Sequence, residues 1–155
     1  MDIQKRNNII SAVLILVIIG LGYWLYRSIV DPYQKVLMEK AMTQKVRTRM
    51  SNVRDVLIKY KNDKNNFPPN LDSLVVFLKT DSAMVAKGAS LFDKTIGHYN
   101  PDSLIHSPRP PHHEFLYARN DTIRPQIYLL TDPDDSTNTI GSLTKTTLLN
   151  AASWE

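Results

Sequence analysis

The feature that most constrains this chain is an uncharged apolar run over residues 9–26, which reads IISAVLILVIIGLGYWLY. In an α-helix these 18 residues extend about 27 Å, close to the thickness of the hydrocarbon core of a bilayer. Basic residues flank the run on both sides. We therefore expect one transmembrane helix over residues 9–26, preceded by a short cytoplasmic tail at residues 1–8.

The C-terminal edge of the run carries three amphipathic aromatic residues, Tyr23, Trp24 and Tyr26. Such side chains favour the membrane interface, so we expect them there. A cleavable signal peptide would have a shorter apolar core followed by small residues, whereas this run continues into GYWLYRS, which predicts a retained anchor. The other alternative is a helix buried in a soluble core, which would also be apolar on every face.

Charge is distributed unevenly along the chain. Residues 1–65 carry 12 Lys and Arg against 5 Asp and Glu, and residues 66–155 carry 7 against 10. Basic charge that follows a membrane span favours anionic headgroups or an acidic partner, so we expect membrane lipid as a partner and no nucleic acid. The chain has no Cys, which excludes disulfides, thiolate metal sites and cysteine nucleophiles.

A basic amphipathic helix is predicted for the stem, residues 27–65, with a bend or restart at Asp31-Pro32. Apolar residues recur at three- and four-residue steps, at Met42, Val46, Met50, Val53, Leu57 and Tyr60. Basic residues flank this face every seven residues, at Lys40, Arg47, Arg54 and Lys61. The helix either packs on its own domain with a solvated basic flank, or packs also on copies of itself or on a partner.

The remaining residues, 66–155, predict a small α+β head. We expect short helices over 71–79 and 82–92, a proline-rich connection over 97–113, and antiparallel strands over 114–120 and 124–131. An acidic loop, DPDDSTNTIGS, follows the second strand. Trp154 is the penultimate residue, and we expect it to be buried against the head.

Two metal sites are conceivable from residue type. Asp132, Asp134 and Asp135 offer hard oxygen ligands for calcium, although Thr137 and Leu143 replace the Gly and Glu of an EF-hand loop. A plain turn is the alternative for this loop. Zinc is the second metal, with His98, His106, His112, His113 and Glu114 as the ligands to consider.

Neighbouring side chains on an extended segment point to opposite sides, so surface histidines are the alternative to a zinc site. No phosphate-binding loop, nucleophile elbow or H-E-x-x-H motif occurs. We therefore expect a protein that is not an enzyme.

The order of segments resembles a known family. A helix ending Val56-Leu57-Ile58-Lys59-Tyr60 leads through a polar turn into Phe67-Pro68-Pro69-Asn70-Leu71-Asp72-Ser73-Leu74. This is similar to type IV pilins and type II secretion pseudopilins, where a helix ending in Tyr precedes a "YP-x-x-L-x-x-L" segment. Asp132-Pro133-Asp134-Asp135 and Asn150-Ala151-Ala152-Ser153-Trp154 resemble the calcium loop and the terminal stretch of the major pseudopilin.

The start of the apolar helix departs from that family. Prepilins have a Gly followed by Phe-Thr-Leu-Ile-Glu, and the Gly–Phe bond is their processing site. This chain has Arg6-Asn7-Asn8-Ile9-Ile10-Ser11-Ala12 instead. The resemblance therefore implies an unprocessed relative that stays in the membrane, with a small antiparallel sheet packed on the stem.

What the resemblance implies about function is structural. The protein would belong to a bacterial envelope assembly, a secretion, pilus-like or motility machine, and would act through protein–protein contacts. Its expected partners are other subunits of that machine, or further copies of this chain bound through the transmembrane and stem helices. The alternative is a membrane-tethered periplasmic binding module for a ligand, a metal or a cell-wall polymer.

A repeated tripeptide bears on orientation. Asp, then Ser or Thr, then an apolar residue occurs around Ser73, Ser82, Ser103 and Thr122. This resembles the acceptor pattern of a periplasmic O-glycosylation system, although Asp-Ser also favours helix caps and turns. The positive-inside count points the other way. We expect a single-pass protein of the bacterial inner membrane with its head in the periplasm and these four hydroxyls as glycosylation sites.

Overall fold

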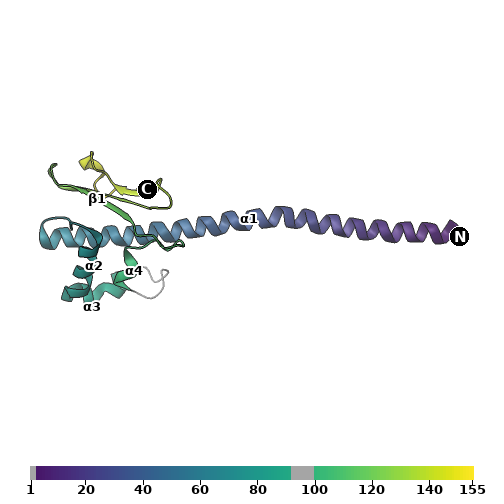
Figure 1. Cartoon of the computed structure of the whole chain (residues 1–155), viewed down its shortest axis with the longest axis horizontal. Coiled ribbons are helices and arrows are strands. Elements are labelled where there is room, and N and C mark those ends of the chain that lie inside the picture. The colour runs from purple at the N-terminus through teal and green to yellow at the C-terminus, as the bar shows by residue number, and fades with distance from the viewer. Residues whose placement is uncertain (1–2, 92–99) are drawn as a thin grey trace. The chain divides into compact units, whose positions relative to one another are not determined.

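The computed structural model describes residues 3–91 and 100–155 and has an α+β fold. The chain divides into two units, Met1–Ala41 and Met42–Glu155. Helix α1 (Ile3–Lys64) runs through both of them (Figure 1). The predicted restart at Asp31-Pro32 is wrong, because α1 continues through Pro32. The turn before Pro32, which lacks the proline N–H, is bridged by an ion pair of 3.1 Å between Arg27 and Asp31.

The first unit is the N-terminal part of α1. Among the described residues, α1 is the one helix that is long and apolar enough to cross a membrane, and none of its most apolar window is buried. The aromatic residues at the end of the apolar run are also solvent-exposed, with exposed fractions of 64% for Tyr23, 69% for Trp24 and 65% for Tyr26.

The second unit is built around the C-terminal part of α1. The apolar face predicted from periodicity is correct: Val46, Met50, Val53 and Leu57 are fully buried. Helix α2 (Leu71–Thr80) begins at the cap residue Asn70, and helices α3 (Ser82–Leu91) and α4 (Pro101–Leu104) follow. These three short helices lie on one side of α1 (Figure 1). Phe92, the predicted end of the third helical stretch, and residues 97–99 of the proline-rich connection lie outside the described residues.

A three-stranded antiparallel sheet lies on the other side of α1 (Figure 1). Strands β1 (Leu116–Asn120), β2 (Ile127–Thr131) and β3 (Thr139–Gly141) follow in that order, with Tyr117 opposite Leu130 and Leu130 opposite Ile140. The first two strands confirm the predicted hairpin. The third was missed, because three residues inside a polar loop are too few to show alternation.

The core lies between α1, the sheet and the short helices. Phe67 and Tyr128 meet edge to face in it, with ring centroids 4.8 Å apart. Trp154 packs against this core, as predicted. Its side chain is only partly buried, however, and so is more exposed than predicted.

Candidate functional site

Two arginines of the basic flank of α1 form hydrogen bonds within the second unit. Nε of Arg47 donates to Oδ1 of Asn138 at 2.9 Å. Nη1 of Arg54 donates to a carboxylate oxygen of Glu155 at 3.1 Å and to the carbonyl of Asn150 at 3.2 Å. The expected solvated flank is therefore wrong for these two arginines, because irregular segments beside the helix need donors for their oxygens.

Arg49 lies on another side of the helix. Its Nη1 donates to the backbone carbonyls of Ser103 at 3.2 Å and His106 at 3.1 Å. Burial lowers the pKa of Arg49. Together the three arginines join α1 to the end of α4 and the residue His106 after it, to the loop before β3 and to the C-terminal end.

The acidic loop distributes its carboxylates to separate partners. Asp132 is buried and accepts a bond of 3.2 Å from the backbone N–H of Asp134. Asp135 accepts from the backbone N–H of Thr137 at 3.1 Å and from its hydroxyl at 2.7 Å. Nδ1 of His113 lies 2.9 Å from Oδ1 of Asp134.

These contacts describe a turn closed by its own side chains. Within residues 3–91 and 100–155, no group of three or more His, Asp or Glu side chains is placed to hold a metal ion. The structure therefore does not bring Asp132, Asp134 and Asp135 together as calcium ligands. Burial raises the pKa of Asp132, and the hydrogen bonds from Thr137 lower the pKa of Asp135.

The histidines considered as zinc ligands also contact different groups. Nδ1 of His106 lies 3.1 Å from the carbonyl oxygen of Asp102, and Nδ1 of His112 lies 3.0 Å from that of Ser107. His98 lies outside the described residues.

The four candidate glycosylation hydroxyls differ in accessibility. Ser82 and Thr122 are exposed, whereas Ser73 and Ser103 are half-buried. The Ser73 hydroxyl donates to Oδ1 of Asn70 at 2.6 Å, and the Ser103 hydroxyl donates to the carbonyl of Asn100 at 2.9 Å. The hydroxyls of Ser73 and Ser103 thus stabilise the starts of α2 and α4.

An open groove of about 520 Å³ lies between the end of α1 and α2. Tyr60 and Phe77 meet there edge to face, with centroids 5.1 Å apart, and Val76 is 58% exposed beside them. The carboxylates of Asp72 and Asp81 also line this groove. Both apolar and hydrogen-bonding side chains therefore line this groove, which is open to solvent.

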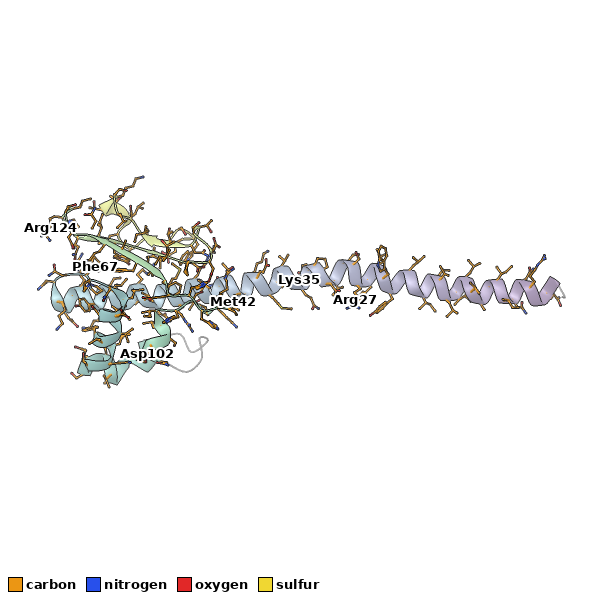
Figure 2. All side chains as sticks on the ribbon, in the orientation of Figure 1. Arg27, Lys35, Met42, Phe67, Asp102 and Arg124 are labelled. Carbon is orange, nitrogen blue, oxygen red and sulfur yellow. The ribbon has the colours of Figure 1, made fainter. Side chains whose placement is uncertain are left out.

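A second exposed apolar surface follows the apolar run in the first unit. Ile29 is 62% exposed, Tyr33 64% and Leu37 46%. Figure 2 marks Arg27 and Lys35 on this stretch, where side chains stand out all around the helix. The apolar face predicted from the sequence begins at Met42. Apolar residues at three- and four-residue spacing also occur before this position.

Comparison of the chain with models of protein families, with curated proteins and with solved structures gives no match.

Proposed function

We propose that the protein is a single-span, membrane-anchored structural component of a bacterial envelope assembly, acting through protein–protein contacts. The observation that carries this proposal is the exposure of the apolar run of α1. Leu16 and Ile18 are 69% and 66% exposed, and water is a poor solvent for such a surface. A bilayer would cover residues 9–26 on every side, with Tyr23, Trp24 and Tyr26 at its interface.

The structure of the second unit supports a role in protein–protein contact. Arg47, Arg49 and Arg54 hold its loops against α1, which makes a compact body directly continuous with the anchor helix. In the proposed arrangement this body lies in the periplasm, on a chain held in the inner membrane. The absence of a Gly–Phe bond before the apolar run supports a retained subunit.

Membrane fractionation of the full-length chain tests the anchor. The protein should sediment with membranes, remain there in alkaline carbonate and high salt, and be released only by detergent. A Leu16→Arg and Ile18→Arg double variant places charge within the span and should reduce membrane retention. A Leu116→Arg variant is the matched control, because Leu116 is an exposed apolar residue of β1. Release of the parent chain by carbonate would refute the anchor.

Co-purification tests the structural role. The detergent-extracted, tagged chain should carry with it other envelope proteins in constant ratio, and protease added to spheroplasts should cut the second unit. Recovery of the chain alone under several mild detergents would count against an assembly. Protection from protease, with periplasmic control proteins cut, would reverse the proposed orientation.

The groove beside α2 favours a second function, a membrane-tethered binding module. Its exposed Val76, the Tyr60–Phe77 pair and nearby carboxylates offer both apolar and hydrogen-bonding surface to a ligand. Soluble cell-wall fragments should then raise the melting temperature of the detergent-solubilised chain. A Val76→Arg change should abolish that shift, and Val85→Arg, at another exposed valine, should preserve it.

A further inference from the structure

We propose that α1 pairs with α1 of a second copy of this chain from the membrane interface outward, through a face formed by Tyr26, Val30, Tyr33 and Leu37. We name these four residues the juxtamembrane face. The inference rests on the proposed membrane anchor and names one of its partners. The resulting unit is a parallel two-helix coil that begins at the bilayer surface.

The juxtamembrane face is apolar where the chain leaves the bilayer. Tyr26 is 65% exposed, Tyr33 64% and Leu37 46%, and Ile29 and Val36 beside them are 62% and 47% exposed. Solvent-facing helices usually turn polar side chains outward, so an apolar stripe of this extent indicates a contact surface.

The opposite side of the same helix is suited to water. Arg27, Asp31, Lys35 and Glu39 follow one another at four-residue steps with alternating sign. The Arg27–Asp31 pair is closed at 3.1 Å. Exposed charges of alternating sign suit contact with water, whereas the apolar side chains of the juxtamembrane face do not.

The spacing of the juxtamembrane face fits another helix. Its residues are separated by four, three and four positions, the a and d pattern of a left-handed coiled coil. A β-branched residue, Val30, occupies one of the a positions, which suits a parallel pair of helices. Lys40 takes the next d position and marks the end of the apolar pattern.

Three arguments favour a second copy as the occupant. The helix is continuous through residues 26–37, so this segment leads out of the bilayer and does not lie along the headgroups. A single-span protein inserts in one orientation, so two copies present identical faces in parallel and in register. Confinement to the bilayer also raises their effective concentration.

The face offers large apolar side chains to a second helix. Tyr26 and Tyr33 are both about two-thirds exposed, and Ile29, Val36 and Leu37 lie beside them. Aromatic side chains of this size dominate the apolar area that protein contacts bury.

Single-cysteine cross-linking tests this pairing, because the chain has no Cys of its own. Val30→Cys and Leu37→Cys would be oxidised in native membranes, with Lys35→Cys on the charged side as the matched control. The two face positions should give about tenfold more disulfide dimer than Lys35→Cys, because a disulfide requires Cα atoms within about 7 Å. Adding Tyr33→Glu to Val30→Cys should lower the dimer yield about tenfold, since it places a charge in the contact.

The outcomes separate this inference from the anchor. Equal dimer yield at the three positions would indicate random collision and overturn the pairing. A cross-linked product of another mass would replace the second copy by a different protein and also overturn it. Membrane-retained protein without any dimer would refute the pairing alone, whereas protein washed from the membrane would refute the proposed function.

Discussion

The guanidinium group of Arg47 lies over the indole ring of Trp154, with Cζ 5.3 Å from the ring centroid. The same guanidinium donates through Nε to Asn138. One side chain of α1 therefore contacts both the loop before β3 and the C-terminal end. Because Ser153 also donates its hydroxyl to the carbonyl of Thr137 at 2.6 Å, the last residues of the chain belong to the second unit.

Replacement of Trp154 by Ala should destabilise the second unit. The change removes apolar area packed on the core and the stacking with Arg47, which we expect to cost about 1–3 kcal/mol. Urea unfolding of the full-length chain in detergent, followed by far-UV circular dichroism, measures this loss. Trp24→Ala is the matched control and should leave the transition unchanged, because Trp24 is 69% exposed in the first unit. Equal transitions for both variants would show that the C-terminal end contributes no stability.

The parts of the fold that the sequence predicted are those with a regular period. The buried face of α1 from Val46 to Leu57 repeats at helical spacing, and the hairpin of β1 and β2 alternates at spacing two. β3 has three residues, and its edge is completed by Ala152, a partner 12 positions away from Ile140. A bridge between residues so far apart in the chain produces no local pattern in the sequence.

The site residues were less predictable, because their roles depend on distant partners. Arg47 and Arg54 share the seven-residue spacing of a solvated flank, and only the fold shows that they bind Asn138 and Glu155. The three aspartates were identified from composition, yet each carboxylate reaches a different neighbour. In contrast, the juxtamembrane face could have been found from its spacing alone.

Arg49→Met should weaken the contact of α1 with the end of α4 and with His106 after it. Methionine preserves much of the apolar stem but removes the two bonds to the carbonyls of Ser103 and His106. Loss of hydrogen bonds from a charged donor should cost about 1.5–3 kcal/mol. The same unfolding measurement applies, with Lys45→Met at an exposed position of α1 as the control. If the variant unfolded at the same urea concentration as the parent, water would satisfy the two carbonyls without loss of stability.

Gly141→Ala should also be destabilising. Gly141 has φ of +87°, and a Cβ there would collide with the backbone carbonyl oxygen of Tyr128. Strain of this kind costs about 1–3 kcal/mol, because the neighbouring backbone belongs to the central strand and cannot move aside. Gly22→Ala provides the control, since the added carbon meets no atom within 4 Å beyond the nearby backbone of its own helix. A parent-like melting temperature for Gly141→Ala would contradict the described geometry of β3.

Asp132 and Asp135 should respond to pH in opposite directions. Burial raises the pKa of Asp132 above its ordinary 3.8, so the folded state holds this proton more tightly than the unfolded chain. Its favourable contribution is complete below the unfolded pKa and is lost as pH rises through the folded one. Asp132→Asn should therefore raise the melting temperature near neutral pH and have less effect near about pH 4.

Asp135 gives the reverse behaviour. Hydrogen bonds from Thr137 lower its pKa below 3.8, so its contribution is present above the unfolded pKa and is lost as pH falls through the folded one. Asp135→Asn should lower the melting temperature near neutral pH and converge with the parent in acid. Shifts of the same sign for both asparagine variants would show that loop packing, and not ionisation, determines their effect.

Glycan attachment, if the second unit is periplasmic, should follow the accessibility of the four candidate hydroxyls. Ser82 and Thr122 are exposed, and the Ser82 position begins a short helix while Thr122 lies in the turn between β1 and β2. Ser73 and Ser103 are half-buried, and their hydroxyls bond to Asn70 and to the carbonyl of Asn100.

A bulky sugar on Ser73 or Ser103 would have to break those cap contacts, and one on the exposed Thr122 would replace the 2.6 Å bond that its hydroxyl donates to Oδ1 of Asn120. The exposed Ser82 can carry a sugar on the surface. Mass spectrometry of peptides from membrane-extracted protein should therefore show hexose-type additions first on Ser82 and then on the exposed Thr122. The variants Ser82→Ala and Thr122→Val should each remove one addition, and Ser136→Ala, at an exposed serine of the acidic loop, should remove none. Unmodified peptides at all four positions, from protein that protease reaches in spheroplasts, would refute the glycan and leave the orientation intact.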